Sequence, residues 1–172
     1  MLNRAYDPAD NGKFDVNAVS NIRNANQAGL GTEVFMTPFP RSNKKGGEQF
    51  RELYEGLKDG KIDVRMVWLQ VTSHVNWRPN SNENIYFLND IKAMAMCYAV
   101  RIGFYNNVYD WNQIAKGATV ERAMLWCWNV NGGGPSGGTP ANFDDFLHSE
   151  FTKPTIKQLG QMEHACGVTV NK

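Results

Sequence analysis

Three stretches of this sequence end in aromatic and amide side chains of the kind that hold carbohydrates. Residues 64–73, 100–107 and 123–129 each begin as an apolar strand and finish among such side chains. If the strands are parallel, their carboxyl ends meet at one edge of the sheet and build a shared cleft there. Sugar rings stack their C–H faces on aromatic rings, while amides and hydroxyls bond the sugar hydroxyls. The residues that we expect to contact a ligand in this cleft are Gln70, Thr72, His74, Trp77, Tyr105, Tyr109, Trp111, Trp128 and Asn129.

The tryptophans of this set also have a plain structural interpretation. Large aromatic side chains are common in protein interiors, so Trp77, Trp111 and Trp128 could equally face the core. Trp68 lies inside its strand and is predicted to be a core residue. Of the other histidines, we expect His148 and His164 to lie on the surface.

Two carboxylates, Asp7 and Asp110, follow strand ends and are the candidates for acid–base chemistry. Both have an alternative role, because an aspartate at such a position often caps the next turn or helix. Glu33 precedes its strand and is expected at the opposite end of the sheet, and residues 144–145 are interpreted as a solvated loop. The sequence holds no cluster with zinc or calcium ligand spacing, so we predict no metal and no other cofactor.

The elements that must position these residues alternate between strand and helix. This alternation is typical of an α/β fold with a parallel sheet. After residue 129 the pattern changes to a glycine-rich stretch, 131–138, which we interpret as a mobile loop at the cleft rim because no phosphate-binding Gly-Lys-Ser/Thr ending follows. The predicted strands are 4–7, 32–37, 64–72, 100–106, 123–129, 155–161 and 168–170, and the predicted helices are 15–28, 48–57 and 84–98.

Composition limits the class of protein. The 172 residues suffice for one domain, which we place over residues 1–172, and the net charge of +1 without a basic block argues against nucleic acid as a partner. We expect no membrane span and no signal peptide, since no apolar run is long enough for either. The three cysteines are too few for a disulfide scaffold, and Cys97 and Cys127 are expected to be buried free thiols.

Several runs of this sequence resemble the glycoside hydrolase family 25 lysozymes, in their nematode-type lysozyme-like branch. Two of them are Val67-Trp68-Leu69-Gln70-Val71-Thr72-Ser73 and Tyr109-Asp110-Trp111-Asn112-Gln113-Ile114. The others are residues 6–8, 11–15, 28–31, 34–38, 76–77, 103–105, 125–129 and 166–171. The resemblance implies a modified TIM-type (β/α) barrel, secretion or a lysosomal location, and cleavage of peptidoglycan between N-acetylmuramic acid and N-acetylglucosamine.

The departures from the family pattern bear directly on chemistry. The family's central strand carries an Asp-x-Glu pair, and in the register set by Trp68 those positions are Gln70 and Thr72. A further aspartate of the family is replaced by Thr169, and the family's first, aspartate-bearing strand would precede this sequence, which makes the barrel incomplete at its N-terminus. Glycoside hydrolysis ordinarily needs a carboxylic acid that donates a proton and a second carboxylate. We therefore expect weak or lost catalysis.

Three functions remain open at this point. The first is a lysozyme-type hydrolase that cuts bacterial cell wall. The second is a non-catalytic protein of innate defence that binds peptidoglycan, as a monomer, through the same cleft. The third is a degenerate partial gene product without a stable fold. Cys166 is a candidate for pairing with a cysteine outside this sequence.

Overall fold

The computed structural model describes residues 1–120, 123–148 and 150–172. Most of its strands form one sheet in the order β2-β1-β3-β4-β5-β6-β7, and a separate hairpin pairs β8 with β9. The strands are β1 (Leu2–Asp7), β2 (Lys13–Phe14), β3 (Glu33–Met36), β4 (Met66–Val71), β5 (Arg101–Asn106), β6 (Met124–Trp128), β7 (Ile156–Gln158), β8 (Glu163–Ala165) and β9 (Val168–Val170). The helices are α1 (Ala18–Gln27), α2 (Gly46–Asp59), α3 (Ser81–Cys97) and α4 (Val108–Ala115), with short 3-10 turns η1 (Ala9–Asn11), η2 (His74–Asn76) and η3 (Pro135–Gly137).

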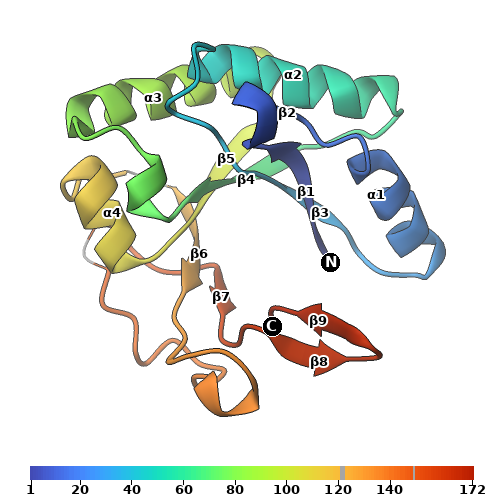
Figure 1. Ribbon diagram of the computed structural model, residues 1–172, viewed down its shortest axis with the longest axis vertical. Helices are drawn as coiled ribbons and strands as arrows, with labels where there is room; N and C mark the ends of the chain where they lie inside the picture. Colours follow the sequence, from blue (N-terminus) through green and yellow to red (C-terminus); the bar gives the residue numbers. More distant parts are fainter. Residues whose placement is uncertain (121–122, 149) are drawn as a thin grey trace.

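The predicted α/β fold with a parallel sheet is confirmed. From β1 to β7 every neighbouring pair in the sheet is parallel, and only the short β2 runs antiparallel, against the end of β1. Figure 1 shows α2 and α3 side by side over one face of this sheet, with α1 and α4 at its flanks. Among the described residues β7 has one strand neighbour, so the sheet stays open between β7 and the β1–β2 edge.

The helix ends differ from the predicted ones because capping groups set them. The Asn80 side chain accepts from the amide of Asn82, so α3 begins at Ser81 rather than at 84. In the same way Asp90 of α3 accepts from the amide of Gly47 at 2.8 Å and holds the start of α2. The helix predicted over 15–28 begins only at Ala18, although the carboxylate of Asp15 accepts from the amide of Asn17 at 3.0 Å.

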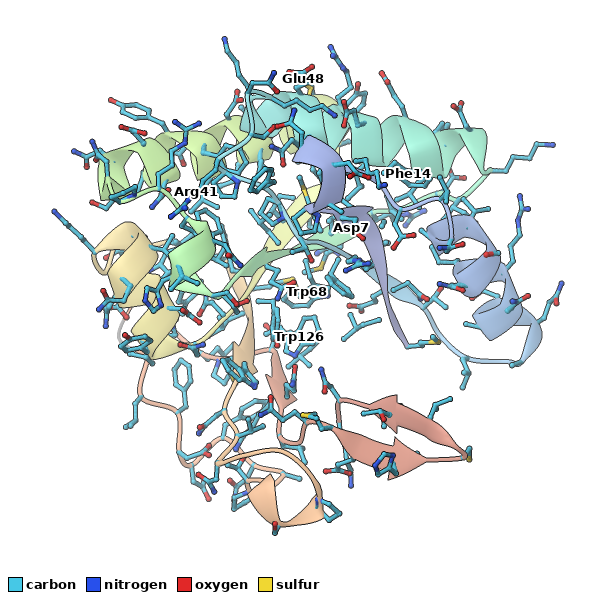
Figure 2. All side chains as sticks on the ribbon, in the orientation of Figure 1. Asp7, Phe14, Arg41, Glu48, Trp68 and Trp126 are labelled. Carbon is cyan, nitrogen blue, oxygen red and sulfur yellow. The ribbon has the colours of Figure 1, made fainter. Side chains whose placement is uncertain are left out.

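The two faces of the sheet bury different side chains, because alternate residues of a strand point to opposite sides. Val67, Leu69 and Val71 of β4 join the large core beneath the helices. Trp68, between them in sequence, lies on the other face with Trp126, and their ring centroids are 6.1 Å apart (Figure 2). The prediction that Trp68 is a core residue is confirmed, since its side chain is buried and its indole nitrogen donates to the carboxylate of Glu33.

The three cysteines are free thiols with different exposure. Cys127 is buried in the helix-side core as expected. The prediction of a buried Cys97 is wrong, since this residue is exposed. The buried face of α3 passes through Ile91 and Ala95, and the helical period of 3.6 residues turns the position two residues later away from that face. None of the described helices combines the length and apolar character needed to cross a bilayer.

Candidate functional site

One pocket lies at the carboxyl ends of β1, β3 and β4, and we call it the Gln70 pocket. Its volume is about 410 Å³. It contains three of the residues predicted from the sequence to bind a ligand, Gln70, Thr72 and Trp77, and one predicted catalytic residue, Asp7. The lining residues are Asp7, Pro8, Ala9, Thr37, Pro38, Phe39, Gln70, Thr72, Ser73, Asn76 and Trp77.

A chain of neutral hydrogen bonds crosses the wall of this pocket. The hydroxyl of Thr37 donates to Oε1 of Gln70 at 2.7 Å, and Nε2 of Gln70 donates to Oγ1 of Thr72 at 2.9 Å. Gln70 and Thr72 lie two residues apart at the end of β4 and therefore share a face, while β3 pairs in parallel with β4 and brings Thr37 alongside. Thr72 accepts within this series of hydrogen bonds, and a threonine hydroxyl can also donate one. The side chains of Thr37, Gln70 and Thr72 can bond hydroxyl and carbonyl groups of a ligand, but none of the three gives up a proton near neutral pH.

Asp7 is the one carboxylate among the described residues that line the Gln70 pocket, and it lies at the end of β1 (Figure 2). Its Oδ2 accepts from Nη2 of Arg4 at 2.6 Å, and its Oδ1 accepts from the amide of Ala9 at 2.9 Å. Both carboxylate oxygens are thus engaged in the turn between β1 and η1. These contacts match the turn-capping alternative.

Asp110 does not lie open at the cleft, which contradicts its predicted catalytic placement. Only 5% of the residue is exposed. Its Oδ1 accepts from the amide of His74 at 2.9 Å and lies 3.2 Å from Nδ1 of the same residue. Its Oδ2 accepts from the side chain of Asn107 at 2.8 Å, and the Asn107 side chain in turn caps α4. Asp110 therefore has a structural role, since its carboxylate ties η2 to the start of α4, although the residue that caps α4 is Asn107.

The tryptophans divide between core and surface. The prediction that Trp111 faces a ligand is wrong, because its ring is buried against Phe104 and Phe151 and its indole nitrogen donates to the carbonyl of Ala118. Trp77 is 3% exposed and reaches the Gln70 pocket only as a buried wall, with its indole nitrogen bonded to the carbonyl oxygen of Thr72 at 3.0 Å. Of the two alternatives given for Trp77 and Trp111, a place in the core is therefore the correct one.

Two other predicted ligand residues lie outside the Gln70 pocket. Tyr105 is buried on the face of the sheet that carries Trp68 and Trp126. Its hydroxyl donates to Oε1 of Gln158 at 2.7 Å, and burial raises its pKa. The side chain of His74 is about one third exposed and contacts the ring of Tyr109 edge-on at a centroid distance of 5.2 Å. The side chains of Tyr105 and His74 therefore do not line the Gln70 pocket.

The remaining predicted residues line a second pocket, which we call the Trp128 pocket, at the carboxyl ends of β5 and β6. Tyr109, Trp128 and Asn129 belong to it, and its volume is about 270 Å³. The outer wall of this pocket, residues 143–148, was not predicted, because an irregular segment has no hydrophobic period that would reveal its inward side chains. The lining residues are Asn107, Val108, Tyr109, Cys127, Trp128, Asn129, Phe143, Asp145, Phe146, Leu147 and His148.

A buried lysine fixes this outer wall to the sheet. Nζ of Lys157, in β7, donates to both oxygens of Asp145 at 2.7 and 2.8 Å and to the carbonyl oxygens of Pro140 and Asn142. Only 4% of the lysine side chain is exposed. The hydrogen bond from Lys157 lowers the pKa of Asp145, and Asn129 adds a further bond at 2.7 Å. Asp145 is therefore a paired anchor rather than the solvated loop residue that we expected.

His148 forms a second anchor, and the prediction that it lies on the surface is wrong. It is 4% exposed and packs against Trp111 and Phe151. Its ring nitrogens lie 2.8 Å from Oε2 of Glu150 and 2.8 Å from Oδ1 of Asn106. Burial lowers the pKa of His148, although Glu150 acts in the opposite direction. A polar partner on each side is what allows a histidine to enter this aromatic cluster.

A family model described as lysozyme-like protein 1 matches residues 1–159 of this chain. The chain belongs to the lysozyme-like protein 1 family. It is 47% identical over 172 residues to lysozyme-like protein 7 of Caenorhabditis elegans, in a match that covers 98% of this chain and 61% of the relative. A more distant relative, "Probable GH family 25 lysozyme 2" of Dictyostelium discoideum, is 29% identical over 168 residues, with 96% of this chain and 74% of the relative covered. The resemblance to family 25 lysozymes is thereby confirmed.

Solved structures confirm the fold of this lysozyme-like chain. The spore cortex lytic enzyme SleM of Clostridium perfringens superposes with a TM-score of 0.65 at 12% identity, covering 99% of this chain and 57% of the enzyme. The modular autolysin LytC of Streptococcus pneumoniae, solved with a synthetic peptidoglycan ligand, gives a TM-score of 0.64 at 10% identity and covers 92% of this chain and 36% of the autolysin. The chain spans about three fifths of the length of two nematode relatives, lysozyme-like proteins 7 and 1 of Caenorhabditis elegans.

Proposed function

We propose that this lysozyme-like chain binds the muramyl glycan of bacterial cell walls and cuts it weakly or not at all. The observation that carries the proposal is the neutral hydrogen-bonded chain from Thr37 through Gln70 to Thr72 at the centre of the predicted cleft. Family membership and the similarity to an autolysin solved with a peptidoglycan ligand support the choice of glycan.

The proposed loss of chemistry follows from the side chains that line the Gln70 pocket. Cleavage of a glycosidic bond needs a carboxylic acid to protonate the leaving oxygen and a second carboxylate as base or nucleophile, at a separation of about 5–9 Å. Gln70 and Thr72 occupy the positions where the family resemblance expects that pair. Asp7, the one carboxylate among the described lining residues, has both oxygens engaged by Arg4 and Ala9.

The test uses the purified chain on two assays in parallel. Pull-down on insoluble peptidoglycan measures binding, and the turbidity of a cell-wall suspension measures cutting. We expect retention on the pellet without clearing of the suspension, and we expect Gln70→Leu to reduce retention because it removes both hydrogen-bonding atoms of the central side chain. Failure of the unmodified chain to sediment with peptidoglycan contradicts the proposal.

A hydrolase that depends on Asp7 is the second candidate. It is favoured by one observation, which is that Asp7 lines the same pocket as Gln70. Clearing of the suspension that is abolished by Asp7→Asn would establish this candidate in place of the first. Asp110→Asn is a poor probe of catalysis, because the buried carboxylate holds His74 and Asn107 in place.

The biological setting is part of the same proposal. By family membership the protein is secreted or lysosomal and acts as a monomer in defence against bacteria. Expression of the protein with a C-terminal fluorescent tag tests location, and light scattering from the purified chain tests the monomer. Retention of the tagged protein in the cytosol contradicts the proposed location. A dimer at micromolar concentration contradicts the proposed monomer.

A further inference from the structure

The Gln70 pocket has a second wall, formed by residues 7–9, which we call the turn wall. These residues lead from the end of β1 into η1. The backbone then continues through three successive residues with positive φ, namely Asp10 at 51°, Asn11 at 71° and Gly12 at 87°. Positive φ is unfavourable for residues that carry a Cβ, so such a turn persists only where surrounding contacts hold it.

The loop between β3 and α2 supplies these contacts. Oγ of Ser42 donates to the carbonyl oxygen of Asn11 at 2.8 Å, and Nδ2 of Asn11 donates to Oδ1 of Asn43 at 2.5 Å. Nζ of Lys44 donates to the carbonyl oxygen of Gly12 at 2.8 Å. Three consecutive residues of one loop are therefore bonded to two consecutive residues of the strained turn. Of the three side chains, only the lysine carries a charge.

Lys44 is itself held in place by α2. Its Nζ lies 2.8 Å from Oε1 of Glu52 and 2.9 Å from Oε2 of the same carboxylate. The hydroxyl of Tyr6, a fully buried residue of β1, also donates to Oε2 of Glu52 at 2.9 Å. The side chains of Lys44 and Glu52 are only 24% and 30% exposed, so water screens this ion pair less than one on the open surface. The ammonium that bonds the turn is thus fixed to both a helix and a strand.

Gly12 brings the turn close to the same cluster. A Cβ at this position would lie 3.0 Å from the hydroxyl oxygen of Tyr6 and 3.1 Å from its Cε1. The backbone of the turn therefore packs directly on the tyrosine ring whose hydroxyl bonds Glu52. Tyr6, Glu52, Lys44 and Gly12 form one connected cluster behind the turn wall.

We propose that Lys44 is a positioning residue of the Gln70 pocket. Because its ammonium is paired with Glu52 and bonds the carbonyl oxygen of Gly12, it fixes the turn and keeps the turn wall at its distance from Gln70. Lys44 lies outside the described lining of the pocket, so it acts on a ligand through the turn alone. The inference rests on the proposed function for the ligand, and it adds what holds the second wall of the site.

The test compares Lys44→Met, Lys44→Arg and Lys45→Met in two measurements. Amide exchange of residues 9–12 reports how firmly the turn is held, and pull-down on insoluble peptidoglycan reports binding. In Lys44→Met we expect exchange at Gly12 to rise about tenfold and retention to weaken about three- to tenfold, as loss of a charged hydrogen-bond donor implies. Lys44→Arg keeps a charged donor and should restore most of both.

Lys45→Met is the matched control. Lys45 is an exposed neighbour that lies outside the described lining of the pocket, and its substitution changes the net charge by the same amount. It should leave exchange and retention unchanged. Glu52→Gln is a milder variant, because it keeps an acceptor for Tyr6 while weakening the ion pair. It should move both measurements in the direction of Lys44→Met, by less, and it replaces that variant if circular dichroism shows a folding defect.

Unchanged exchange at Gly12 in Lys44→Met overturns the proposal, and so does unchanged retention when exchange rises. Equal losses in Lys44→Met and Lys44→Arg, or in Lys44→Met and Lys45→Met, also overturn it. Retention that depends on Gln70 but not on Lys44 removes this inference and leaves the proposed function standing. If the unmodified chain does not sediment with peptidoglycan, the proposed function falls and takes the binding role of Lys44 with it.

Discussion

The Gln70 pocket and the Trp128 pocket lie at one edge of the same sheet but are built in opposite ways. The wall of the first is made by strand ends, whose parallel pairing sets the spacing of Thr37, Gln70 and Thr72. The outer wall of the second is an irregular segment that depends on two side-chain anchors, Lys157 and His148. The sheet therefore supplies the geometry of the strand-end wall of one pocket, whereas single polar contacts supply that of the outer wall of the other. Their sensitivity to mutation should differ accordingly.

The largest effect should come from Lys157→Met, which removes the anchor of the Trp128 pocket. The substitution leaves Asp145 and two carbonyl oxygens without their donor. Breaking one half of a buried ion pair costs about 3–5 kcal/mol, and since Asp145 is 34% exposed we expect about 2–3 kcal/mol off the free energy of unfolding. Urea unfolding measures the loss, and amide exchange should rise in residues 139–148.

Lys58→Met is the control for this prediction. Lys58 is paired with Asp63 at 2.9 Å, but both side chains are mostly exposed. Water screens an exposed ion pair, so this variant should unfold at nearly the same urea concentration as the unmodified chain. Equal losses in the two lysine variants would mean that burial of Lys157 does not set the strength of its contacts.

Gln70→Leu should have the next largest effect, on the other pocket. It deprives Thr37 and Thr72 of their partner while keeping a side chain of similar size. We expect about 1–2 kcal/mol off the free energy of unfolding, as for two lost neutral hydrogen bonds that are only partly shielded from water. Thr37→Val removes one of the two bonds and should cost about half as much. Exchange rates in residues 139–148 should stay unchanged, and a rise there would show that the pockets are coupled.

The sequence alone predicts the strand ends of the molecule better than its irregular segments, as the two pockets illustrate. The strands at the centre of the sheet and their ends were predicted because apolar runs bounded by polar residues are local signals, and Gln70 and Thr72 were found in this way. Trp111 and His148 were misplaced because they are buried against each other, and His148 comes from an irregular segment some 40 residues further along the chain than Trp111. The short strand β8 was also missed, since three residues carry too little pattern to be recognised.

The two pockets should also differ in how they contribute to the pH dependence of stability, by less than the effects of the substitutions above. Burial places the pKa of His148 in the folded chain below its value in the unfolded chain, which is about 6.5. Above that pH both states are neutral, so the stability is fully present there. As pH falls through 6.5, the unfolded chain binds a proton that the folded chain does not, and stability is lost.

The measurement is the free energy of unfolding at pH 7.5 and at pH 5.5, in the unmodified chain and in two variants. His148→Gln should reduce the loss between the two pH values, whereas His164→Gln, in the exposed β8–β9 hairpin, should not. An equal loss of unfolding free energy in all three proteins would show that His148 does not cause the pH dependence of stability. No comparable titrating histidine is found among the described lining residues of the Gln70 pocket.

The smallest effect should come from Asp7→Asn, although Asp7 is the carboxylate that lines the Gln70 pocket. Its partner Arg4 has a side chain that is 42% exposed, so the ion pair at 2.6 Å contributes only about 0–1 kcal/mol. Asparagine keeps an oxygen that can accept from the amide of Ala9, and the turn into η1 should therefore persist. Peptidoglycan retention should change less than in Gln70→Leu, because a side chain that caps a turn acts on the glycan only through that turn. If retention falls further in Asp7→Asn than in Gln70→Leu, the charge of Asp7 and not the neutral chain beside it is the main binding determinant of this pocket.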